Sequence, residues 1–169
     1  MENIAPSPQS PSPGIRKKES IVRMIAWEVT RSCNLNCIHC RAAASRGPYP
    51  GELSTEKCLA LIDEIAAVSS PVIILTGGEP LLRPDIFDLA SYGTQKGLRM
   101  VMATNGTLVD QTVAQKMIAS GIQRVSISID GKDAPSHDDF RQEPGAFAGA
   151  MRSIDALKAA GMEFQINTT

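Results

Sequence analysis

The stretch PVIILTGGEP, residues 71–80, decides the fold class of this chain. Its first half, 71–75, is an almost continuous apolar run, which is typical of a strand buried on both faces of a parallel sheet. The run then reaches Gly77 and Gly78, so the strand gives way to a loop at that point. A buried parallel strand needs neighbouring strands and covering helices, and the sequence predicts both around this stretch.

Strand and helix patterns alternate along the chain. We expect strands at 23–30, 71–75, 98–103, 124–129 and 163–167, and helices at 54–68, 84–96, 110–120 and 146–160. Repeated units of this kind cross over right-handed and build a parallel sheet. The helix ends carry the usual residues: N-cap candidates Ser54 and Asp110, Pro84 for a first helical position, and Gly97, Gly121 and Gly161 for left-handed C-terminal positions.

Two connections are longer than the others, and both follow strands. One spans 31–53 and contains three cysteines, and the other spans 131–145. Connections that follow parallel strands gather at the carboxyl edge of the sheet, where active sites of α/β proteins form, so we expect both to face one pocket. The last expected strand ends near Thr169 with no helix after it. Because an eight-stranded barrel takes roughly 250 residues, we expect the N-terminal part of a longer protein.

Composition and charge narrow the function classes. The chain has 169 residues, of which 43% are apolar, and a formal net charge of -1, which suits one soluble domain. No broad basic face is available for nucleic acid, and no apolar run approaches the roughly 20 residues of a membrane helix. Residues 1–20 hold four prolines among serines and charges, with no apolar signal segment. We therefore expect a disordered tail, an ordered domain at 21–169 and a cytoplasmic location.

Cysteine spacing points to a metal cluster. Cys33, Cys37 and Cys40 lie within eight residues at the spacing C-x3-C-x2-C, and three close neighbours make a poor disulfide framework. Zinc would need a fourth ligand, and His39 is cramped beside Cys40. Iron–sulfur clusters accept cysteines at short, uneven spacings, and three thiolates leave one iron of a cubane open to a ligand. Cys58 falls on the apolar stripe of the helix that follows, so we expect it in the core.

The cysteine triplet directly after the first expected strand, with Gly77-Gly78-Glu79-Pro80 directly after the second, resembles the radical S-adenosylmethionine (SAM) superfamily. The resemblance runs from about Met24 to Thr169 and implies an α/β fold, a parallel (β/α) partial TIM barrel. It implies that the three cysteines hold a 4Fe–4S cluster whose open iron SAM chelates through its amino and carboxylate groups. In this superfamily, reduction of the cluster cleaves SAM to methionine and a 5′-deoxyadenosyl radical, which abstracts hydrogen from the substrate.

The same resemblance implies a set of SAM contacts. Glu79 and the Gly78 carbonyl would accept hydrogen bonds from the SAM amine, and the glycines would let the backbone approach the ligand closely. His39 stands where relatives often carry an aromatic residue beside the adenine, with contact to a substrate metal as the alternative. Arg141, in the segment HDDFR, would meet the SAM carboxylate with its guanidinium fork. The full expected set is His39, Gly77, Gly78, Glu79, Pro80, Asn105, Ser128, Asp130, Arg141 and Asn167.

Structural readings of the same residues stay open. GGEP on its own would be a strand-to-loop turn, and Asn105-Gly106 suits the apex of another turn. Arg141 has a surface ion pair as its alternative, and Trp27 fits the core better than a site. In the expected strand at 124–129, polar and apolar residues alternate. If the isoleucines face the helices, then Ser126, Ser128 and Asp130 point into the barrel.

Finer resemblance concerns the substrate. Residues 25–44, 47–55 and 71–90 resemble the haem-forming branch of siroheme-dependent haem biosynthesis. This implies oxidative decarboxylation of two propionates of iron-coproporphyrin III to vinyl groups, with an electron donor such as a ferredoxin or flavodoxin. Arg41, Arg46 and Tyr49 are then expected contacts of the tetrapyrrole carboxylates. Three alternatives stay open: a sister enzyme that removes acetate side chains from a siroheme derivative, a peptide-maturing radical SAM enzyme, and a non-catalytic cluster- or SAM-binding module.

Overall fold

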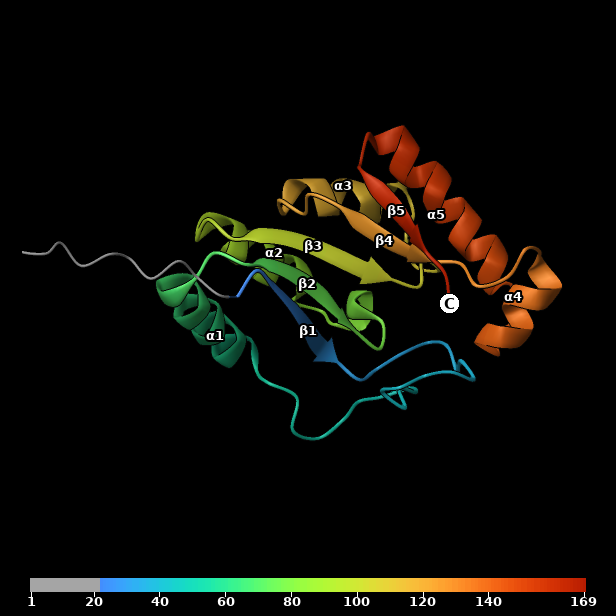
Figure 1. Cartoon of the computed structure of the whole chain (residues 1–169), viewed down its shortest axis with the longest axis horizontal. Coiled ribbons are helices and arrows are strands. Elements are labelled where there is room, and N and C mark those ends of the chain that lie inside the picture. The colour runs from blue at the N-terminus through green and yellow to red at the C-terminus, as the bar shows by residue number, and fades with distance from the viewer. Residues whose placement is uncertain (1–21) are drawn as a thin grey trace, which may run out of the picture.

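A computed structural model describes residues 22–169 of the chain. These residues form one parallel five-stranded sheet in the order β1-β2-β3-β4-β5, each strand paired with the next along the chain (Figure 1). The tail expected at 1–20 lies outside the described residues. Because successive strands pair in parallel through helical crossovers, the sheet is the open, partial barrel that the sequence predicts.

All five expected strands and all four expected helices are confirmed, with small differences at their ends. The strands are β1 Met24–Thr30, β2 Val72–Gly77, β3 Arg99–Thr104, β4 Val125–Ser128 and β5 Phe164–Asn167. The helices are α1 Thr55–Val68, α2 Ile86–Gln95, α3 Gln111–Ala119, α4 Ala134–Arg141 and α5 Ala146–Ala160, with a short 3-10 helix, η1, at Pro80–Leu82.

The core lies between one face of the sheet and the helices α1, α2, α3 and α5. Leu75 and Met102 of the sheet, Ile62 of α1 and Met117 of α3 are completely buried there. Cys58 is 1% exposed and belongs to this cluster, so its expected place in the core is confirmed. This packing leaves the opposite, concave face of the sheet free for a site.

Two expectations about local structure were wrong. Pro84 does not begin a helix: α2 begins at Ile86, after Asp85. Asp85 is engaged by Arg83 and accepts a hydrogen bond from Thr55, and this network of side chains fixes the approach to the helix. The second long connection, expected as a loop at 131–145, contains α4.

Helix α4 escaped prediction because its sequence is polar. Its start is fixed by a capping box in which the Asp133 carboxylate accepts from the Ser136 N–H and the Ser136 side chain accepts from the Asp133 N–H. Its buried residues are His137 and Arg141, so no apolar stripe marks the helix in the sequence. A helix that buries a cation and an imidazole has a reason other than apolar packing to be where it is.

Candidate active site

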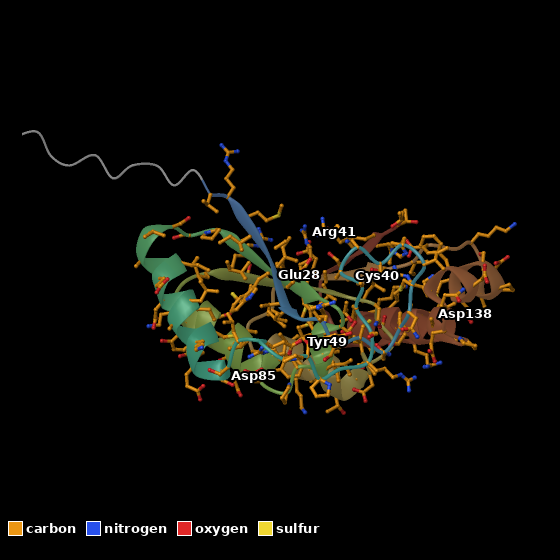
Figure 2. The ribbon with its side chains drawn as sticks, turned by 90° about the horizontal axis from the view of Figure 1, so that it is seen from below. Glu28, Cys40, Arg41, Tyr49, Asp85 and Asp138 are labelled. Atoms are coloured by element: carbon orange, nitrogen blue, oxygen red, sulfur yellow. The ribbon has the colours of Figure 1, made fainter. Side chains whose placement is uncertain are left out.

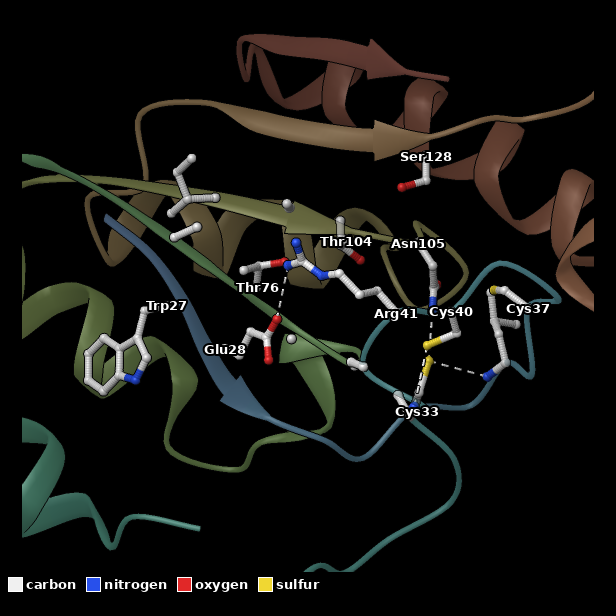
Figure 3. Close-up of a pocket in the computed structure, with 18 of the residues that line it drawn as sticks. Trp27, Glu28, Cys33, Cys37, Cys40, Arg41, Thr76, Thr104, Asn105 and Ser128 are labelled. Carbon is white, nitrogen blue, oxygen red and sulfur yellow. Dashed lines mark hydrogen bonds and ion pairs between the residues drawn. The ribbon is translucent and has the colours of Figure 1, made fainter. Parts of the chain in front are cut away.

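A cavity of about 920 Å³ opens on the concave face of the sheet (Figure 3). Its walls come from β1 to β4 and from the loop that follows β1, which runs along the strand ends toward α4 in Figure 1. All three clustered cysteines line it, as does Arg141 from the end of α4. The structure therefore brings both long connections to one cavity, where the sequence analysis expected them to meet.

The thiols of this loop are surrounded by N–H donors. The Leu35 N–H donates to Cys33 Sγ at 3.4 Å, and the Ala44 N–H donates to Cys40 Sγ at 3.3 Å. Arg141 Nη1 lies 3.5 Å from Cys37 Sγ. Donors of this kind stabilise negative charge on ligating sulfur, and they surround the cysteines of iron–sulfur proteins.

The donor set of the loop fits a multi-iron cluster. Cys33, Cys37 and Cys40 are free thiols. Among residues 22–169, no three His, Cys, Asp or Glu side chains come together closely enough to hold a single metal ion. Burial raises the pKa of Cys33, and the Leu35 N–H acts in the opposite direction. Burial likewise raises the pKa of Cys58, which does not line the large cavity.

Gly77 and Gly78 let the end of β2 approach the cysteine loop. A Cβ on Gly77, whose φ is +131°, would lie 2.2 Å from the Thr30 carbonyl oxygen, and a Cβ on Gly78 would lie 2.3 Å from that of Ser32. The Gly78 N–H donates to the Thr30 carbonyl at 2.8 Å. Both glycines also line the cavity. Their requirement for glycine thus comes from contact between two backbones, whereas the sequence analysis attributed it to contact with a ligand.

Glu79 is completely buried and does not line the cavity. Its carboxylate accepts hydrogen bonds from the Thr104 hydroxyl at 2.8 Å, the Asn105 N–H at 2.9 Å and the Leu81 N–H at 3.2 Å. Burial raises its pKa to about 6, although these hydrogen bonds favour the ionised form. Glu79 therefore joins the carboxyl ends of β2 and β3 beneath the wall of the cavity.

Arg141 and Asp130 form a buried ion pair at the end of β4. Asp130 also accepts a hydrogen bond from the Thr169 N–H at 2.9 Å and does not line the cavity. The Arg141 Nε is buried and has no hydrogen-bond partner among the described residues. An unsatisfied guanidinium donor beside the thiols fits an anionic group such as a carboxylate of SAM.

The remaining expected contacts divide into two groups. Ser128 and Asn105 line the cavity, and Asn105 donates to Asn34 of the cysteine loop at 2.9 Å. Ile127 of β4 is buried in the core, as the alternation of that strand predicts. Pro80 is buried in η1 and Asn167 is exposed on β5, and the structure brings neither to the cavity wall.

Of the three residues expected to contact a tetrapyrrole, only Arg41 lines the large cavity. Its guanidinium pairs with Glu28 of β1 at 3.4 Å (Figures 2 and 3). Tyr49 lines a smaller neighbouring cavity, beneath the Arg31 guanidinium, and Arg46 is exposed and lines neither cavity. The sequence analysis missed Glu28, although the period-two alternation of β1 places it on the same face as Ala26.

Trp27 lies on the other side of β1 from Glu28 (Figure 3). It packs against the core cluster, as the sequence predicted, and it also borders both cavities. His39 lines the large cavity, and its ring stacks on Phe140 of α4.

Comparison with known proteins agrees with this geometry. Residues 27–169 match the Radical SAM superfamily, so the chain belongs to that superfamily. Members of the superfamily bind a 4Fe–4S cluster and SAM. The structure of Streptococcus suis SuiB bound to S-adenosylmethionine superposes with a TM-score of 0.73 at 15% identity, covering 88% of this chain and 34% of that one. This likeness shows the fold.

Three relatives cover most of this chain. The AdoMet-dependent heme synthase of Nitratidesulfovibrio vulgaris is 60% identical over 147 residues, which are 87% of this chain and 40% of that protein. The Fe-coproporphyrin III synthase of Methanosarcina barkeri is 42% identical, covering 86% and 36%. The mycofactocin maturase of Mycobacterium ulcerans is 39% identical, covering 81% and 37%. The chain thus spans about two fifths of the length of these relatives.

Among the described residues, no helix has the length and apolar character needed to cross a membrane.

Proposed function

We propose that this chain is the cluster- and SAM-binding part of an enzyme that oxidatively decarboxylates iron-coproporphyrin III in haem biosynthesis. One observation carries the first half of the proposal: three free thiols on one loop, each with an N–H donor at its sulfur, border an open cavity at the carboxyl edge of the sheet. In parallel α/β folds this edge is where active sites form.

The substrate half rests on the gradient of identity. The chain is 60% identical to a heme synthase, against 42% to a Fe-coproporphyrin III synthase and 39% to a peptide-related maturase. A difference of this size across the same region favours the substrate class of the nearer relative. The sister deacetylase and the peptide-maturing enzyme are the competing functions, and a non-catalytic module is the third.

The residues have separable tasks in this function. Cys33, Cys37 and Cys40 would hold the cluster, which when bound supplies the electron that starts SAM cleavage. The free Nε of Arg141 is available to a carboxylate of SAM, and the Gly78 carbonyl to its amine. Arg41, held by Glu28 at the cavity, is available to a propionate of the tetrapyrrole. An external donor such as a ferredoxin or flavodoxin would reduce the cluster.

The overall conversion at each propionate balances without another reactant. Loss of one hydrogen atom from the carbon beside the macrocycle is followed by cleavage of the bond to the carboxylate carbon. Carbon dioxide leaves, one electron passes to an acceptor, and the two remaining carbons form the vinyl group. The walls of the cavity would exclude water from this radical chemistry.

The decisive experiment is anaerobic cluster reconstitution followed by electron paramagnetic resonance (EPR) of the reduced protein, with and without SAM. We expect SAM to change the cluster signal, because it would occupy the open iron. Cys37→Ala should abolish the signal, whereas Cys58→Ala, as the matched control, should retain it. A wild-type signal that is indifferent to SAM would contradict the proposal.

Mass spectrometry then separates the substrate classes. The reconstituted protein is incubated with SAM, a reductant and either iron-coproporphyrin III or the siroheme derivative. Loss of carbon dioxide and two hydrogens per propionate supports the proposed decarboxylase. Loss of acetate side chains identifies the sister activity, and SAM binding without cleavage in either mixture identifies a non-catalytic module.

A further inference from the structure

The end of α4 contacts the cysteine loop at three consecutive residues. The Ile38 N–H donates to the Phe140 carbonyl at 3.1 Å, the His39 ring stacks on the Phe140 ring, and Arg141 reaches Cys37 Sγ. About one hundred residues of chain separate the two partners, so their contact is tertiary. Two adjacent residues of one helix thus set the course of the middle of the loop.

The stacking geometry is specific. The centroids of the His39 and Phe140 rings are 4.4 Å apart and the ring planes are 18° from parallel. An aromatic ring has two faces, and Phe140 covers one face of His39. His39 is nevertheless exposed and lines the large cavity, so its second face is open to a ligand there. Offset-parallel rings at this separation attract each other beyond simple area burial.

Phe140 is the fixed partner of this pair. Helix α4 is held at its start by the capping box of Asp133, and His137 Nδ1 accepts from the Asp130 N–H at 3.1 Å. Asp138 accepts from the N–H groups of Gly145 and Phe147 at the start of α5. His39 belongs to a loop without helix or strand, and so the helix orders the loop residue.

We propose that Phe140 is a positioning residue that holds the His39 ring ready to stack on the flat base of an adenosyl ligand. The proposal rests on the proposed function for the identity of that ligand. Base-on-aromatic stacking is a general mode of nucleobase recognition and is worth about 5- to 100-fold in affinity. Holding the ring in place before binding spares the immobilisation of one side chain, which is worth about 2- to 10-fold.

Histidine NMR tests the contact directly. The chain has only two histidines, and each ring packs on a different phenylalanine: His39 on Phe140, and His137 edge-on to Phe147 at 5.6 Å. In the cluster-free chain labelled at histidine, Phe140→Leu should remove the ring-current shift of the His39 imidazole alone. Phe147→Leu is the matched control and should move only the His137 signal. Unchanged His39 signals in Phe140→Leu would overturn the proposal.

Binding to the cluster-loaded chain tests the purpose of the contact. SAM affinity should fall about 2- to 10-fold in Phe140→Leu and recover in Phe140→Tyr, because tyrosine keeps the ring. Methionine, which lacks the base, should bind the wild type and Phe140→Leu equally. If Phe140→Leu weakens methionine and SAM alike, or neither, Phe140 does not position the base. If the wild type itself fails to bind SAM, the proposed function fails, and this inference fails with it.

Discussion

Replacing Gly78 with alanine should separate the end of β2 from the cysteine loop. The added Cβ would lie 2.3 Å from the Ser32 carbonyl oxygen and 2.7 Å from the Arg31 carbonyl oxygen, whereas ordinary van der Waals contact begins near 3.4 Å. Both obstacles are backbone atoms, which cannot rotate away as a side chain can. The two segments must therefore move apart by about 1 Å in an interior that is close-packed.

The cost follows from what that movement disrupts. The Gly78 N–H donates to Thr30 and the Glu79 N–H donates to Ser32, both at 2.8 Å. Weakening two such hydrogen bonds costs about 1 kcal/mol each, and overpacking adds about 1–3 kcal/mol. The free energy of unfolding should fall by about 2–5 kcal/mol, which is a large part of the roughly 5–15 kcal/mol of a typical domain.

Urea unfolding of the cluster-free chain, followed by circular dichroism, measures this loss. Gly149→Ala is the control: its Cβ would meet Thr107 at 3.1–3.3 Å, a mild crowding that alanine's better helix propensity offsets by about 1 kcal/mol. Gly78→Ala should also lower the iron retained after reconstitution, because the loop that holds the thiols is displaced. An unfolding midpoint for Gly78→Ala equal to that of the wild type would refute the steric reasoning.

Three further changes test other parts of the structure. Arg83→Met should lower the free energy of unfolding by about 3–5 kcal/mol, because Asp85 loses its buried partner, and adding Asp85→Asn should recover part of the loss in urea titrations. Cys58→Ala should cost about 1 kcal/mol of stability and leave the iron content unchanged, and a drop in iron would show that Cys58 is a ligand. Burial lowers the pKa of His137 from 6.5, so the unfolded chain takes up the proton first and the stability due to this histidine is lost as the pH falls below about 6.5. The stability difference between wild type and His137→Gln should accordingly shrink from about pH 7 to pH 5, and a constant difference would contradict this sign.

Most of the sheet was predictable because each of its strands carries a local signal. The apolar run of β2, the alternation in β4 and the glycines that end the helices each depend on a few neighbouring residues. Gly97, Gly121 and Gly161 have φ of 79°, 80° and 73°, the left-handed conformation that their position after a helix predicts. Helix α4 has no such signal, because the residues that it buries are polar.

The site was predictable in its members more than in its contacts. The spacing of Cys33, Cys37 and Cys40 is local, and it marks the metal site in the sequence. The pairing of Glu28 with Arg41 and the stack of His39 on Phe140 join segments that the sequence does not relate. Glu79 shows the same limit, because its hydrogen bonds to Thr104 and Asn105 depend on the pairing of strands. Local patterns identify chemistry, whereas tertiary contacts decide which atoms remain free to perform it.

The polarity that hid α4 explains its place at the cavity. An apolar helix end would leave the Asp130 carboxylate buried without a counter-charge, which is costly in a low-dielectric interior. Arg141 supplies that charge, and its guanidinium has donors to spare: one reaches Cys37 Sγ and the Nε is unsatisfied. Asp130 therefore holds the guanidinium in place while leaving part of it available. The buried pair fixes a cation at the edge of the thiol site, where an incoming carboxylate can complete its hydrogen bonding.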